Sequence, residues 1–169
     1  MKKLVLLALV LCSLNVFAQR DETDAFGSKA ISFGPELNIT TKGIYKTGYG
    51  VSGRIEWPLG DEFAIDGTAG YNRFFFKNAD QFTQGANVFV PVKAGVTFFW
   101  DSNIYANGHA GTVQQLNYEK QSSFAYDFGV GYLLPIKGNN GLDLGFRYER
   151  WGKNRMREAV IRVAYRFGW

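Results

Sequence analysis

The chain has 169 residues, of which 46% are hydrophobic, and a formal net charge of +4 at pH 7. This length fits one domain, and so small a charge, without a basic run, argues against nucleic acid as a partner. Cys12 is the one cysteine, so the sequence excludes an internal disulfide and a small fold stapled by cysteines.

The first 18 residues have the layout of a secretory signal peptide. Lys2 and Lys3 form a positive start, an apolar core follows at 4–11, and Ala18 is a small residue at the expected cleavage point. A lipoprotein signal ending at Cys12 is the alternative, but bulky Leu11 stands where such a signal has a small residue. We expect cleavage after Ala18 and an exported domain at 19–169.

Beyond the signal, apolar residues recur at every second position, which is the period of a strand and not of a helix. The alternation predicts eight strands: 31–39, 49–57, 63–71, 88–100, 104–114, 124–134, 142–150 and 159–169. The fifth segment has the weakest pattern. No segment after the signal approaches the roughly 18 consecutive apolar residues that a membrane helix needs. The fold class is therefore expected to be all-β.

The expected connections alternate between short and long. Tight-turn composition marks residues 58–61, 101–103 and 137–141. Longer polar stretches lie between these turns, at 40–46, 77–85, 115–123 and 152–157. This alternation is typical of an up-and-down barrel that crosses a membrane, with the short turns on the periplasmic side. The even strand count would place both ends of the barrel there.

The two faces of the strands favour a membrane barrel. The apolar face gathers tyrosine and tryptophan near strand ends, as the two interfaces of a bilayer select: Tyr49, Trp57, Tyr71, Trp100, Tyr132, Tyr148, Tyr165 and Trp169. A soluble ligand-binding barrel of the lipocalin kind, with the apolar face inside, is the alternative. We predict an eight-stranded antiparallel up-and-down transmembrane β-barrel.

The opposite face carries charged residues that such a barrel directs into its lumen. They are Glu36, Arg54, Glu56, Asp66, Lys93, Asp127, Asp143, Arg147, Glu149, Arg162 and Arg166. An eight-stranded barrel has an interior just wide enough for side chains to fill it, and buried charge is tolerable there only when paired. Five bases against six acids predict an ion-paired structural network that plugs the lumen. A narrow ion path is the alternative.

The last segment, 159–169, resembles the C-terminal signature of bacterial outer-membrane proteins. Alternate positions are apolar and end in the rings of Tyr165, Phe167 and Trp169. The domain as a whole resembles the small eight-stranded barrels of the porin superfamily in Gram-negative bacteria, of the OmpX and OmpA-transmembrane type. The resemblance implies the cell outer membrane, the barrel-assembly machinery as a partner during biogenesis, and outer-membrane lipids and lipopolysaccharide as surroundings. We expect a monomer.

Two features suggest a binding or catalytic site, but the residues around each of them argue against one. The stretch GYGVSG at 48–53 matches a dinucleotide-binding fingerprint, but strand alternation runs through it and no helix follows. His109 is the one histidine and has no cysteine or second histidine as a fellow metal ligand. It also lacks the adjacent serine of lipid A deacylases. We expect no catalytic residue, no metal site and no cofactor.

Three functions stay open at this point. The first is a non-enzymatic structural or surface-interaction role through the loops that face outwards, since function on a rigid scaffold usually lies in loops. The second is a narrow, porin-like diffusion channel. The third is a lipid A-modifying enzyme.

Overall fold

The computed structural model describes residues 28–77, 86–101, 103–117, 121–152 and 156–169. The predicted signal peptide lies outside these residues, as do parts of the predicted connections 77–85, 101–103, 115–123 and 152–157. Eight strands make up the structure: β1 (Ala30–Lys42), β2 (Tyr45–Pro58), β3 (Phe63–Phe76), β4 (Ala86–Asp101), β5 (Ile104–Gln115), β6 (Ser122–Lys137), β7 (Asn140–Trp151) and β8 (Met156–Gly168).

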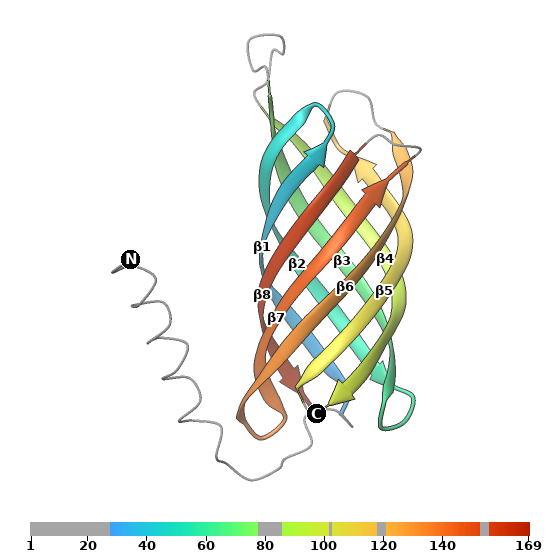
Figure 1. Cartoon of the computed structure of the whole chain (residues 1–169), viewed down its shortest axis with the longest axis vertical. Helices are drawn as coiled ribbons and strands as arrows, with labels where there is room; N and C mark the ends of the chain where they lie inside the picture. Colours follow the sequence, from blue (N-terminus) through green and yellow to red (C-terminus); the bar gives the residue numbers. More distant parts are fainter. Residues whose placement is uncertain (1–27, 78–85, 102, 118–120, 153–155) are drawn as a thin grey trace, which may run out of the picture.

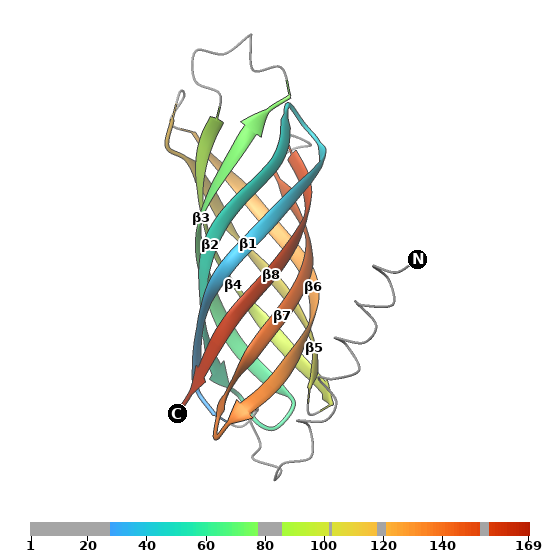
Figure 2. The same ribbon diagram turned by 90° about the vertical axis from the view of Figure 1, so that its left-hand side faces the viewer.

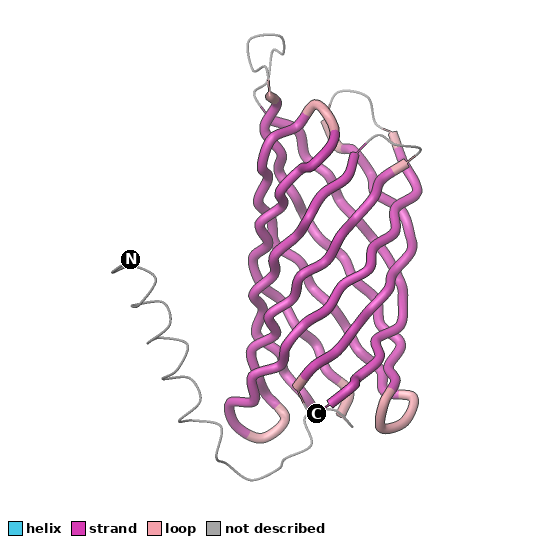
Figure 3. The backbone as a smooth tube through the Cα atoms, viewed as in Figure 1, coloured by secondary structure: helices cyan, strands magenta, loops and turns pink. Residues whose placement is uncertain are grey.

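The strands form one closed barrel in which every neighbour pair is antiparallel (Figure 1). Each strand pairs with the next along the chain, and β8 returns to pair with β1, as Figure 2 shows. The predicted fold class is therefore confirmed. The described chain is strand and short turn throughout (Figure 3), and none of its residues form a helix long and apolar enough to cross a membrane.

One predicted connection is wrong. The stretch 40–46 was expected to be a long polar loop, but β1 and β2 continue through most of it and leave a turn of Gly43 and Ile44. Gly43 has a φ of 134°, a conformation that other residues rarely adopt. The alternation breaks here because each strand has an irregularity, between Thr40 and Lys42 and between Tyr45 and Gly48.

The outer wall of the barrel is apolar. Trp100 is 82% exposed, Phe128 66% and Phe33 59%, and aliphatic side chains fill the surface between such rings. Of the tyrosines and tryptophans predicted to face outwards near strand ends, all are exposed except Tyr165, which is half-buried. A soluble monomer rarely exposes a continuous apolar belt, whereas a barrel in lipid requires one.

The interior has three layers. An aromatic cluster fills the end that carries the longer connections, here called the loop end: Phe74, Phe89, Val113, Ala125, Trp151 and Met156, with Tyr45 packed against them. The middle holds charged side chains. A smaller apolar cluster closes the other end, where β1 begins and β8 ends: Ala64, Phe99, Tyr105 and Leu133. The lumen is thus filled along its length.

Two seams of the barrel are interrupted at prolines, which lack the N–H that a strand ladder needs. Between β1 and β8, pairing stops at Phe33↔Tyr165 and resumes at Glu36↔Arg162, leaving out Pro35. Between β3 and β4 it stops at Ala69↔Val92 and resumes at Asn72↔Phe89, leaving out Pro91 and Gly70 opposite it. We call these the Pro35 seam and the Pro91 seam.

Candidate functional site: the filled lumen and its wall

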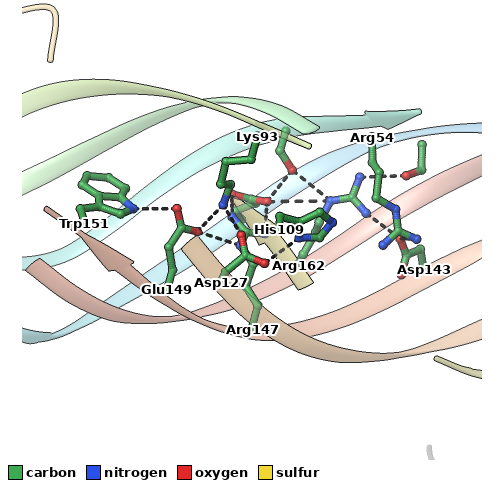
Figure 4. A network of polar contacts seen from close by, with 12 residues as sticks. Arg54, Lys93, His109, Asp127, Asp143, Arg147, Glu149, Trp151 and Arg162 are labelled. Carbon is green, nitrogen blue, oxygen red and sulfur yellow. Dashed lines mark hydrogen bonds and ion pairs between the residues drawn. The ribbon is translucent and has the colours of Figure 1, made fainter. Parts of the chain in front are cut away.

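The charged middle layer is one connected structure. Its ion pairs join twelve side chains in an unbroken series, in the order Arg166, Glu56, Arg54, Asp143, Arg162, Glu36, Arg147, Glu149, Lys93, Asp127, His109 and Asp66. Each of the eight strands contributes at least one member, and β1 contributes Glu36. The network therefore connects side chains from all around the barrel wall. Figure 4 shows its central part.

Arg147 on β7 links the two halves of this network. Its guanidinium donates two parallel hydrogen bonds to Glu36, at 2.7 and 2.9 Å, and its Nε donates to Glu149 at 3.0 Å. Glu149 is further held by the ammonium of Lys93, at 2.8 Å, and by the indole N–H of Trp151, at 2.6 Å. Bidentate arginine–carboxylate pairs are among the strongest charge-assisted hydrogen bonds.

The second arginine hub lies nearer the chain ends. Arg162 donates to Asp143 at 2.6 Å and to the hydroxyls of Ser32 and Ser52 at 3.0 Å. Asp143 is fully buried and also accepts a hydrogen bond from the hydroxyl of Tyr105. The charges here are therefore compensated by fixed partners.

His109 lies inside the barrel and not on a lipid-facing groove. It is 6% exposed, and its two ring nitrogens each lie 2.6 Å from a carboxylate oxygen, of Asp66 and of Asp127. Both nitrogens face acceptors, which makes the ring a linker within the network. In the described part of the chain, no group of three or more histidine, cysteine, aspartate or glutamate side chains could hold a metal ion.

Little free space remains among these side chains. A cavity of about 40 Å³ lies beside Arg54, His109 and Arg162, which is room for about three water molecules. On the lipid-facing side, an open groove of about 770 Å³ runs from β7 and β8 across β1 and β2 to β3. Its lining includes the rings of Phe33, Tyr71 and Tyr165.

The cavity and the groove share one thin part of the wall. Both are lined by four small residues, Ser52, Gly53, Ala69 and Gly70, which we call the window. Ser52 pairs with Gly70 and Gly53 with Ala69, so the window is two positions of β2 against two of β3. Its β3 side borders the Pro91 seam, where pairing with β4 is interrupted.

A polar shelf lies between the network and the aromatic cluster, and the sequence analysis missed it. It comprises Asn38, Thr40, Asn72 and Glu158, of which Asn38, Asn72 and Glu158 are at most 1% exposed. Their amide, hydroxyl and carboxylate atoms include six that are buried without a hydrogen-bond partner. Asparagine and threonine inside an alternating strand gave no signal, and Glu158 precedes the segment predicted as the last strand.

The structure places each predicted lumen residue inside the barrel. All eleven join the ion-pair series, ten of them buried and Arg147 half-buried. The sequence analysis did not foresee that His109 joins them, nor that Tyr105 and Trp151 donate into the network. The glycines of the fingerprint-like stretch 48–53 lie within β2, where no helix follows to hold a phosphate.

The predicted C-terminal signal lies on β8 at the Pro35 seam. The ring of Phe167 stacks on Phe33 of β1, with centroids 5.8 Å apart, and contacts the ring of Tyr165 at 4.5 Å. Beyond the strand, the backbone N–H of Trp169 donates to the carbonyl of Lys29 at 2.9 Å. Whether these rings direct assembly stays a prediction.

The fold of this barrel is similar to the folds of solved outer-membrane proteins. Ail, the attachment invasion locus protein of Yersinia pestis, is 18% identical with a TM-score of 0.58, covering 83% of this chain and 99% of that one. OprG of Pseudomonas aeruginosa is 10% identical (TM-score 0.59; coverage 83% and 96%). AlkL, solved in lipid bilayers, is 10% identical (TM-score 0.60; coverage 89% and 94%). At these identities the likeness is one of fold.

No curated protein matches the sequence at a significant level. A family model does match, over residues 18–167, and its description is "Putative MetA-pathway of phenol degradation". The match spans all but the last residue of the barrel, including both interrupted seams, the window and the ion-pair network. The chain therefore belongs to the putative MetA-pathway phenol degradation family, and its fold is a closed eight-stranded β-barrel like those of solved outer-membrane proteins.

Proposed function

We propose that this barrel admits small apolar molecules at its loop end and releases them sideways, through the window, into the membrane. The observation that carries the proposal is the window itself. There a lumen cavity and a lipid-facing groove are separated by four small residues beside an interrupted seam. The family description, which names phenol degradation, supports a small aromatic compound as the cargo.

A straight path along the barrel axis is disfavoured by the network. An apolar molecule would have to displace paired charges such as Arg162 and Asp143, whose separation in a buried setting is costly. The cavity in this layer holds only about 40 Å³, far below the size of an aromatic ring with its surroundings. This argues equally against the continuous porin-like channel considered from the sequence.

The loop end has the side chains that favour an apolar ligand. Phe74, Phe89 and Trp151 pack on one another inside the lumen there, with ring centroids 5.0 to 5.7 Å apart. Aromatic rings and aliphatic groups form the lining of most sites for small organic ligands. Along β4, the Pro91 seam lies between Phe89 of this cluster and Lys93 of the ion-pair network.

The wall beside the window is weakened at the Pro91 seam. Gly70 and Pro91 form no ladder pair, so opening this seam breaks fewer hydrogen bonds than opening a continuously paired one. On the outer side, the groove has about 770 Å³, within the about 300–1,000 Å³ that is usual for ligand clefts. A molecule that leaves through the window therefore enters an apolar groove open to lipid.

The test measures the initial uptake rate of radiolabelled toluene by cells that produce the barrel. Gly70→Val, which fills the window, is expected to reduce uptake at least fivefold. Pro135→Val is the matched control for altering a strand, because Pro135 lies outside both seams and outside the window. If Gly70→Val assembles normally and takes up toluene at the wild-type rate, the lateral route is wrong.

The surface-interaction role expected from the sequence stays a prediction. Residues 78–85, 118–120 and 153–155 lie outside the described residues, and they include parts of three of the four predicted outward connections. No observation within the described barrel favours a lipid A-modifying activity, since His109 faces the lumen and contacts two carboxylates there.

A further inference from the structure

We propose that the polar shelf is a binding site for the hydroxyl group of a hydroxylated aromatic ring, of the phenol or catechol class. The inference rests on the proposed function for access from the loop end, and it goes further by naming which aromatic compounds the barrel selects. It is carried by buried polar atoms that have no partner and lie against a cluster of rings.

The unpartnered atoms of the shelf are well defined. They are both amide atoms of Asn38, the hydroxyl of Thr40, the amide oxygen of Asn72 and both carboxylate oxygens of Glu158. Buried polar groups in folded proteins are almost always hydrogen-bonded, and a buried carboxylate without a partner is especially unfavourable. A shelf with six such atoms is therefore expected to take up hydrogen-bonding partners from a ligand or from water.

Register brings these side chains to one side of the lumen. Thr40 and Glu158 are direct partners on β1 and β8, and Asn38 lies two positions along β1 on the same face. Across β2, Asn38 pairs with Gly48 and Asn72 pairs with Gly50. Since neither glycine has a side chain, no β2 side chain stands between Asn38 and Asn72.

The shelf adjoins the aromatic cluster directly. Gly48 is the partner of Phe74 as well as of Asn38, and a Cβ on Gly48 would lie 2.6 Å from the ring of Phe74. Asn72 is the partner of Phe89, the next ring of the cluster. A ring that packs among Phe74, Phe89 and Trp151 would therefore direct a substituent towards Asn72.

The chemistry of the shelf favours a neutral hydrogen-bond donor. Among the six unpartnered atoms, acceptor oxygens predominate, and only the Asn38 amide nitrogen and the Thr40 hydroxyl offer protons. The nearest bases are already engaged: Lys93 with Asp127 and Glu149, and Arg147 with Glu36 and Glu149. A phenolic hydroxyl donates to a carboxylate and also accepts from an amide, which matches this set.

Phenol and toluene are the natural probes, because they differ by a hydroxyl in place of a methyl group. The refolded barrel in detergent micelles is titrated with each, and the side-chain amide and indole signals are followed by NMR, with empty micelles correcting for partition. We expect phenol to bind at least tenfold more tightly than toluene and to shift the amide signals of Asn38 and Asn72.

Three variants assign the selectivity to the shelf. Glu158→Gln and Asn72→Ala should each weaken phenol binding about tenfold and leave toluene binding unchanged. Asn107→Ala is the matched control, because Asn107 is another lumen asparagine with an unpaired carbonyl oxygen, on β5 beside the central cavity. Should Glu158→Gln fail to fold, Asn72→Ala carries the same comparison.

The outcomes separate this inference from the proposed function. Equal affinity for phenol and toluene, or phenol binding that survives both shelf variants, overturns the inference even if toluene uptake still depends on the window. Shelf-dependent phenol binding without window-dependent toluene uptake upholds the site and overturns the lateral route. If sodium or calcium ions alone shift the Asn38 and Asn72 signals and abolish phenol binding, the shelf is a cation site and the inference is wrong.

Discussion

Replacing Arg147 with methionine removes the cation that joins the two halves of the ion-pair network. Glu36 then loses two hydrogen bonds, of 2.7 and 2.9 Å, and keeps the hydroxyl of Ser52 and, at 3.8 Å, the guanidinium of Arg162. Glu149 loses one bond of 3.0 Å but keeps Lys93 and Trp151. The substitution therefore leaves one buried carboxylate poorly compensated and a second one weakened.

Breaking a buried ion pair from one side typically costs about 3–5 kcal/mol. The side chain of Arg147 is 15% exposed, so water offsets part of the loss and the lower end of that range applies. A loss of about 3 kcal/mol is roughly a hundredfold in the unfolding equilibrium constant. With a urea dependence of about 1–3 kcal/mol per M, the unfolding midpoint should fall by about 1–3 M.

The assay is reversible urea unfolding of the barrel in lipid vesicles, followed by tryptophan fluorescence. Arg73→Met is the matched control, because Arg73 lies on the outer face of β3, with its guanidinium 5.8 Å from the ring of Phe75. The double variant Glu36→Leu, Arg147→Met should recover at least half of the lost stability, since it removes the stranded carboxylate. If Arg147→Met unfolds within about 0.5 kcal/mol of the wild type, the lumen is hydrated and the plug interpretation is wrong.

Three further predictions concern packing, closure and assembly. Gly95→Ala should abolish the folded band on unheated denaturing gels, because a Cβ there would lie 2.1 Å from the carbonyl oxygen of Gly108. Gly67→Ala is the control and should fold normally, because a Cβ there would have no neighbour nearer than 3.7 Å. Equal folding of the two variants refutes the packing argument. Planar bilayers with the wild-type barrel should show no stepwise conductance, and regular steps would contradict the filled lumen. Phe167→Ala should lower the folded yield in cells more than in refolding from urea, and equal losses would refute a role in cellular assembly.

The strand pattern was predictable because each barrel strand has one face in lipid and one in a polar lumen. Period-two alternation is then strong, and all eight predicted segments lie within or almost within the observed strands. The prediction failed where the alternation of apolar and polar residues stops. Phe74, Phe75 and Phe76 are consecutive, so the sequence gives no hint that Phe74 and Phe76 face inwards, and the predicted strand stopped at Tyr71.

The membership of the ion-pair network was also within reach of the sequence, since parity assigned eleven charged residues to the lumen. Which of these residues form ion pairs with one another could not be predicted. Arg147 and Glu36 are 111 positions apart, and which charges meet depends on how far the strands are staggered around the barrel. Glu158 escaped notice because the predicted last strand began one residue later, at Ala159.

The two proline-interrupted seams lie on either side of three consecutive strands, β1, β2 and β3. Mechanically, the barrel is therefore not a uniform cylinder: both edges of a three-stranded panel have a gap in pairing in mid-strand, and the seams among the other five strands do not. The outer groove lies mainly across this panel. Lateral pressure from the bilayer acts equally in all directions of the membrane plane. If the wall opens as proposed, it should part first along the panel's edges, and the thickness and tension of the surrounding membrane should affect how readily it opens.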